Sequence, residues 1–171
     1  MLPDTRAPVL VSLAVLLSVA LYTDLRYGKI PNKLTFPCMV VGLTLGLLSD
    51  GFHGFLLSLA GIGIVLGLYL VTYSTAIGGG DIKLMMAVGS LVGLRLTIWA
   101  MLFSAVIGGI LAIIVMARYK TVLSTTRNLA THVYLSVALR APTELSGGPS
   151  VTKFRYSPAI ALGTLLTILV K

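Results

Sequence analysis

Acidic side chains are scarce in this sequence of 171 residues: five residues are Asp or Glu, against thirteen Lys or Arg. Charged residues make up only 11% of the chain, whereas 57% of it is hydrophobic, and the mean hydropathy is +1.00. A soluble core of this length could not bury so much apolar surface, while each bilayer-spanning helix needs roughly 20 mostly apolar residues. The composition excludes an ordinary soluble domain and predicts an all-α polytopic membrane protein.

Cysteine is also nearly absent. The single cysteine, Cys38, lies within an apolar run, which excludes a disulfide framework and a zinc cluster. Neither His53 nor His132 has a second metal-binding side chain at a useful spacing, so we predict no metal site and no cofactor. The net charge of +8 does not indicate a nucleic-acid partner, because the basic residues fall in short loops between apolar runs, where such residues set membrane topology.

Apolar runs divide the chain into six predicted transmembrane helices in a single domain over residues 1–171. Gly28 and Pro31 should end the first helix, since Gly suits the position after a helix and Pro cannot continue one. Arg95 interrupts the apolar run between the fourth and fifth spans. The six spans are expected at residues 8–23, 34–49, 55–76, 84–94, 96–117 and 156–170.

Two of these spans carry additional signals. In the third span, Gly61, Gly63 and Gly67 are expected to allow close helix contacts of the small-residue kind. The fourth span is barely half the usual length, so the membrane has to thin there or the residues before it have to be drawn toward the membrane.

A basic segment over residues 118–140 separates the fifth and sixth spans. Leu129, Val133 and Val137 share one face at a spacing of four residues, which favours a helix lying in the headgroup plane. A solvated loop is the alternative interpretation. The residues that follow, 141–151, read as a turn-rich linker.

Counting basic residues orients the predicted spans. The loops after the first, third and fifth spans hold ten Lys or Arg, against three for the other side with both termini. Basic residues are enriched on the cytoplasmic side of membrane proteins. We therefore expect those three loops to be cytoplasmic and both termini to lie outside.

Two of the few acids lie at the same predicted depth. Asp24 ends the first span and Asp81 precedes the fourth, and two spans separate them, so both carboxylates should lie at the cytoplasmic face. Two carboxylates within reach of one another and partly shielded from water share a proton. In an aspartic protease the ionised member draws a proton from a bound water while the protonated member donates one to the substrate.

The three glycines before Asp81 form the most distinctive stretch of the chain. Gly78, Gly79 and Gly80 lack Cβ atoms, so a helix or an extended peptide can lie against this backbone. Asp81 is then expected to open a helix over residues 82–94. As a plain structural alternative, Asp81 is the N-cap of that helix, although an ionisable group at a membrane span indicates a functional site by default.

These residues resemble a known family. Gly78-Gly79-Gly80-Asp81 resembles the GxGD motif of intramembrane aspartic proteases, and Asp24 followed by Ile30-Pro31-Asn32 resembles the first aspartate region of type IV prepilin peptidases. Ser157-Pro158-Ala159-Ile160 with Gly163 resembles the start of their last helix. With one cysteine and no cytoplasmic insert, the chain resembles the short, Flp-type form without the zinc-binding and methyltransferase segment.

The resemblance implies that Asp24 and Asp81 are catalytic, with a multi-pass location in the bacterial cytoplasmic membrane. It implies cleavage of leader peptides from type IV prepilins or pseudopilins at the cytoplasmic face, with pilus or secretion assembly proteins as further partners. Lys83 beside the motif is implied to position the substrate, together with the glycines and Asn32. On the residues alone, Lys83 is a topology charge and Asn32 a turn residue.

Two functions of other classes remain as alternatives. A small ion- or proton-coupled transporter would use the same two aspartates to bind a cation or relay protons. A structural subunit of a secretion complex would use Asp81 only as a helix cap. Replacing each aspartate by asparagine separates the three, and Glu144 is the other acid that could meet either aspartate.

Overall fold

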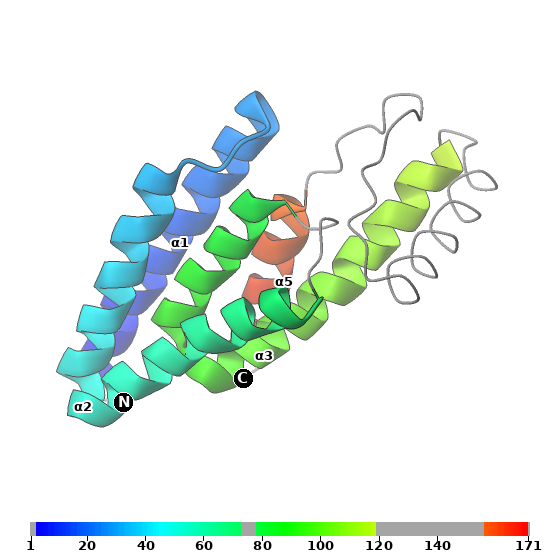
Figure 1. Cartoon of the computed structure of the whole chain (residues 1–171). Helices are drawn as coiled ribbons and strands as arrows, with labels where there is room; N and C mark the ends of the chain where they lie inside the picture. Colours follow the sequence, from blue (N-terminus) through cyan, green and yellow to red (C-terminus); the bar gives the residue numbers. More distant parts are fainter. Residues whose placement is uncertain (1–2, 73–77, 119–155, 171) are drawn as a thin grey trace. The chain divides into compact units, whose positions relative to one another are not determined.

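The computed structural model describes residues 3–72, 78–118 and 156–170, and the described residues contain helices and no strands (Figure 1). The predicted all-α class is therefore confirmed for this part of the chain. Residues 119–155 lie outside the described part of the chain. They include the predicted basic segment except for Arg118, the predicted linker, His132 and Glu144. The helices are α1 (Pro3–Tyr27), α2 (Asn32–Thr72), α3 (Gly79–Arg118) and α5 (Ser157–Leu169).

The chain divides into two compact units. The first comprises Met1–Gly108 and Arg155–Lys171, and the second Gly109–Phe154. Among the described residues, the second unit contains only the last turns of α3. Helices α1 and α2, the greater part of α3, and α5 all belong to the first unit, which also contains every predicted site residue.

Helix α2 is two helical segments joined by a reversal. Asp50 has φ −130° and ψ 23°, and Gly51 has φ 60° and ψ −144°, so neither residue is helical. The Ser58 hydroxyl donates to the Gly42 carbonyl at 3.4 Å although the two residues are sixteen apart. A straight helix would separate them by about 24 Å at its rise per residue, so the chain turns back at the predicted connection.

Helix α3 turns back in the same way at Gly93, which has φ 75° and ψ 171°. Glycine adopts this left-handed region without the steric cost that a Cβ atom imposes. Residues on either side of the turn lie together, since a Cβ atom built on Gly89 would meet the Thr97 methyl group at 3.3 Å. The break between the fourth and fifth segments, predicted at Arg95, therefore lies two residues earlier, at Gly93.

Six helical segments result among the described residues: α1, two in α2, two in α3, and α5. Three stretches are long and apolar enough to cross a membrane, namely Ala7–Tyr27, Asn32–Leu70 and Gly79–Ile114, and Ser157–Leu169 is a shorter apolar helix. The two reversals divide the second and third of these stretches near the predicted places. That each of the six segments spans the bilayer stays a prediction.

The core is centred on the first segment of α3. Its residues are buried on nearly every side, including Leu84, Ala87, Val88 and Leu91, as expected for a helix that is apolar all round. The same cluster contains residues from three other helices: Leu13, Leu16, Leu17 and Ala20 of α1, Val65 of α2, and Ile160 of α5. This segment begins with the glycines and Asp81, so the core fixes the place of the predicted site.

Large apolar side chains also cover much of the outer surface. In α1 they include Leu10, Val11, Val15 and Val19, and in the second segment of α3 they include Leu102, Val106 and Ile110. Extended apolar surfaces of this kind mark contact with a membrane or with protein partners. Together with helix length, they indicate that lipid surrounds these helices.

One of the three glycines predicted to make close contacts in the third span does so. A Cβ atom at Gly61 would collide with the Gly89 carbonyl oxygen, and one at Gly89 would lie 2.6 Å from the Gly61 carbonyl oxygen. The prediction is wrong for Gly63 and Gly67, where no described atom lies within 4 Å of a built Cβ. At this point the backbones of α2 and α3 thus meet through one glycine from each helix, Gly61 and Gly89.

We expect Gly89→Ala to destabilise the protein by about 1–3 kcal/mol, because the two backbones have to separate to admit a methyl group. Gly63→Ala is the matched control, since it adds the same group to exposed space and gains helix propensity. Thermal unfolding in detergent, followed by far-UV circular dichroism, measures both. Equal stability of the two variants would contradict the close contact.

Candidate active site

Asp24 lies in the last turn of α1. The Gly28 N–H donates to the Asp24 carbonyl at 2.9 Å, and α2 begins directly after Pro31, whose carbonyl accepts from the Leu34 N–H at 3.0 Å. The predicted end of the first helix before Gly28 is therefore confirmed, whereas the helix starts at Pro3, five residues before the predicted start of the span. The Asp24 side chain is only 7% exposed, so its carboxylate has lost most of its contact with solvent.

A serine from the C-terminal part of the chain donates a hydrogen bond to one oxygen of this carboxylate. The Ser157 hydroxyl donates to Asp24 Oδ2 at 2.6 Å, and both residues are buried. Ser157 is the first residue of α5. Ser157 belongs to the stretch Ser157-Pro158-Ala159-Ile160, whose sequence predicts no role for it. A small hydroxyl residue just before a proline at the start of an apolar helix is the signal that could have found it.

Asp81 lies inside the first turn of α3 and does not precede it. The helix begins at Gly79, and the Asp81 and Ile82 N–H groups both donate to the Gly78 carbonyl, at 2.9 and 3.3 Å. The expectation that Asp81 opens a helix beginning at residue 82 is therefore wrong, and Asp81 is not its N-cap. Asp81 Oδ2 points back toward Gly78, at 3.1 Å from the place a Cβ would take there.

The structure brings Asp24 and Asp81 close enough for their charges to interact. Tyr156 also lies within electrostatic reach of Asp81. Its hydroxyl donates to the Ser104 carbonyl in α3 at 2.9 Å. The C-terminal end of α1 and the N-terminal end of α3 thus lie near the beginning of α5, where Ser157 bonds to Asp24 and Tyr156 lies within electrostatic reach of Asp81.

Lys83 and Asn32, two predicted substrate-binding residues, bond to one another. Lys83 Nζ donates to Asn32 Oδ1 at 3.0 Å and lies 5.9 Å from the centre of the Phe36 ring. Asn32 is the first residue of α2, whereas Lys83 lies two residues after Asp81. The pair therefore joins the start of α2 to the start of α3 beside the acids.

The three glycines leave open space at this end of α3. Gly78 and Gly79 are exposed, and no described atom lies within 4 Å of a Cβ built on Gly79. A Cβ on Gly80 would reach Ile30 at 3.4 Å, an ordinary contact. Packing among the described residues therefore does not require glycine at position 79, and the backbone there is accessible to another chain.

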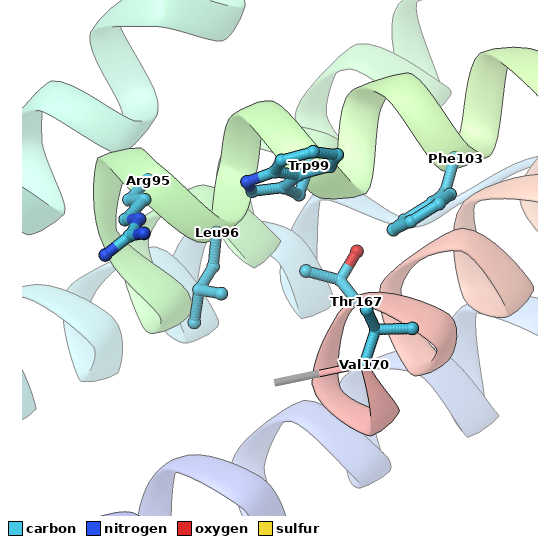
Figure 2. A pocket seen from close by; sticks show the side chains of 6 residues that line it. All are labelled: Arg95, Leu96, Trp99, Phe103, Thr167 and Val170. Atoms are coloured by element: carbon cyan, nitrogen blue, oxygen red, sulfur yellow. The ribbon is translucent and has the colours of Figure 1, made fainter.

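A separate cavity of about 210 Å³ lies between the second segment of α3 and the last turns of α5. Figure 2 shows Trp99 and Phe103 from α3 beside Thr167 and Val170 from α5. Its lining is completed by Arg95 and Leu96, and it contains none of the predicted site residues. Among the described residues, no group of three or more His, Cys, Asp or Glu could hold a metal ion.

Comparison with known proteins points to a peptidase family. The sequence matches the profile of the Type IV leader peptidase family over residues 11–113, a range that contains Asp24, Asn32 and the stretch from Gly78 to Lys83. It is 29% identical over 106 residues to the Prepilin leader peptidase/N-methyltransferase of Bacillus subtilis (strain 168), an alignment covering 60% of this chain and 42% of that relative. The matched part is thus less than half of the relative's length. No solved structure matches the chain.

The hydrogen bond between Lys83 and Asn32 is testable as a coupling. We expect Lys83→Met and Asn32→Ala to show a coupling free energy of about 0.5–1 kcal/mol in a double-mutant cycle, because a partly exposed bond to a charged donor is screened by water. Unfolding by SDS in mixed micelles measures it. Lys33→Met is the control, since the adjacent Lys33 is exposed and should show no coupling with Asn32→Ala. Equal coupling for the two lysines would exclude the bond.

Proposed function

This chain belongs to the type IV leader peptidase family, and from that premise we propose that it is a membrane aspartic endopeptidase. Its proposed substrates are type IV, Flp-like prepilins or pseudopilins, whose leader peptides it cleaves at the cytoplasmic face of the membrane. Asp24 and Asp81 are the proposed catalytic residues. The family match favours this function over an ion-coupled transporter.

The observation that carries the proposal is the meeting of two carboxylates in a chain with only five acids. Asp24 is buried at the end of α1, Asp81 lies in the first turn of α3, and their charges interact. Bringing two carboxylates together in partly apolar surroundings is costly unless they share a proton. A protein gains nothing in stability from such a pair, so its presence supports a chemical role.

The proposed step is the addition of water to a peptide carbonyl. The ionised acid takes one proton from the water while the water oxygen bonds to the carbonyl carbon, and the protonated acid gives its proton to the carbonyl oxygen. The resulting diol then collapses. The acid that took the proton from water gives it to the amide nitrogen as the C–N bond breaks. The acid that protonated the carbonyl oxygen takes a proton back from a hydroxyl of the diol. Both acids end in their starting states.

The surroundings of the acids support access for an extended peptide. The exposed backbone at Gly78 and Gly79, together with Gly80, offers a surface free of side chains next to Asp81. A backbone without Cβ atoms lets an extended peptide approach closely. Lys83 and Asn32 form the adjacent polar edge, so we assign them to the binding of the leader segment.

The proposed location is the bacterial cytoplasmic membrane, crossed six times, with pilus or secretion assembly proteins as further partners. The six helical segments support the number of crossings. Helices α1 and α5 each supply one segment, and the reversals at Asp50-Gly51 and Gly93 divide α2 and α3 into two segments each. Ten of the thirteen basic residues fall on the side that carries Asp24 and Asp81 in this arrangement. That asymmetry supports a cytoplasmic site.

Asp24→Asn and Asp81→Asn should each reduce prepilin cleavage by about 10³-fold or more, because neither variant retains an acid pair able to exchange a proton with water. Asp50→Asn is the control: Asp50 is exposed at the reversal of α2, and its variant should cleave within about twofold of the unmodified protein. The assay follows a purified prepilin substrate in liposomes.

Cleavage that survives in either Asp24→Asn or Asp81→Asn would end the proposed role of the pair. Loss of ion flux in both variants, in a protein that shows no prepilin cleavage, would instead support the transporter. Circular dichroism of each variant in detergent establishes that the helices remain folded, so a loss of activity reports on chemistry.

The proposed orientation is testable with single cysteines. In a Cys38→Ala background, Lys29→Cys marks the loop between α1 and α2, and His53→Cys marks the reversal of α2, and both positions are exposed. A membrane-impermeant maleimide should label His53→Cys in intact cells and Lys29→Cys only in inverted vesicles. Labelling of both positions from the same side would contradict the six crossings.

A further inference from the structure

At the N-terminal end of α5, Ser157 makes a polar contact with Asp24 that has no role in the reaction proposed above. From this contact we infer that Ser157 is a positioning residue, which holds the Asp24 carboxylate by Oδ2 and so fixes the direction of Oδ1 relative to Asp81. The inference rests on the proposed function for its activity readout. It concerns a residue outside the range matched by the family profile.

The contact has the geometry of a strong, specific hydrogen bond. Ser157 Oγ lies 2.6 Å from Asp24 Oδ2, which is in the range for a hydroxyl that donates to a carboxylate. Ser157 is 1% exposed and Asp24 is 7% exposed, so water competes weakly for either group. A carboxylate held at one oxygen loses the rotation about its Cβ–Cγ bond that would otherwise spread its other oxygen over many directions.

The serine is itself held in place by α3. Tyr156 precedes Ser157 in the chain, and its hydroxyl donates to the Ser104 carbonyl at 2.9 Å. The Tyr156 ring packs against Gly108 and occupies the space that a Cβ atom there would need. Further along α5, a Cβ on Gly163 would lie 2.6 Å from the Ser104 backbone nitrogen. Two contacts on Ser104 thus fix the rotation and depth of the start of α5.

This arrangement links the two acids through a third helix. Asp24 belongs to α1 and Asp81 to α3, and α5 is anchored to α3 while its Ser157 bonds to Asp24. A shift of α1 relative to α3 would therefore break the Ser157 bond. Because proton transfer requires hydrogen-bond distances, a displacement of about 1 Å in such a site costs up to about a hundredfold in rate.

Ser157→Ala should lower kcat for leader cleavage by about tenfold to a hundredfold. It should change KM by less than about twofold, because the serine does not contact substrate. Ser157→Thr, which keeps a hydroxyl, should recover kcat to within about threefold of the unmodified protein. Thr164→Val is the matched control: Thr164 is a buried hydroxyl residue of the same helix that donates to the Ile160 carbonyl, and its loss should leave kcat unchanged.

A spectroscopic measurement tests the contact without any activity. The protein has only four aspartates, Asp4, Asp24, Asp50 and Asp81, so carbon-13 labelling of aspartate side-chain carboxyls gives a simple spectrum, in which Asp24→Asn identifies the Asp24 signal. That signal should shift in Ser157→Ala and stay in place in Thr164→Val, for protein in detergent at one pH.

An unchanged kcat in Ser157→Ala overturns the inference, as does an equal loss in Thr164→Val or an unmoved Asp24 signal. Failure of the proposed function has a different signature, because cleavage would then survive in Asp24→Asn while the carboxyl signal still reports on the contact with Ser157.

Discussion

The first segment of α3 imposes the constraint on which the rest of the structure depends: this helix is buried on nearly every side, and it carries a carboxylate, Asp81, in its first turn. Apolar packing gives this segment its fixed place, but the same packing cannot stabilise the charge of Asp81. Polar groups from other helices gather at its N-terminal end, where the Asp24 carboxylate repels that of Asp81 and does not stabilise its charge. The end of α1 brings Asp24, and the start of α5 brings Tyr156 and Ser157.

Close backbone contact is what allows this gathering. At Gly61 and Gly89 the second segment of α2 touches the first segment of α3 without intervening side chains, so the central segment is enclosed tightly. Gly93 then turns the chain back, and the second segment of α3 offers Ser104 as the anchor for α5. The short α5 helix, although last in the chain, thereby completes the polar junction around Asp24.

Much of this organisation follows from local properties of the chain. The apolar runs predicted the helical class and the approximate extents of the helical segments, because hydropathy and helix length are read along the sequence. Gly28 and Pro31 predicted the end of α1, since they act on the backbone where they stand. The even number of predicted spans between Asp24 and Asp81 predicted that both acids lie at one end of the helices.

The sequence by itself therefore determined the helices, their approximate ends and the placement of two acids at one end of them. Only the tertiary structure decided that α3 begins at Gly79, that Lys83 bonds to Asn32, that Ser157 bonds to Asp24, and that Gly61 alone of its neighbouring glycines makes a close contact. The physical reason is that such contacts depend on the rotation and depth of one helix against another. Hydropathy is nearly uniform around helices that face both core and lipid, so it does not encode that rotation.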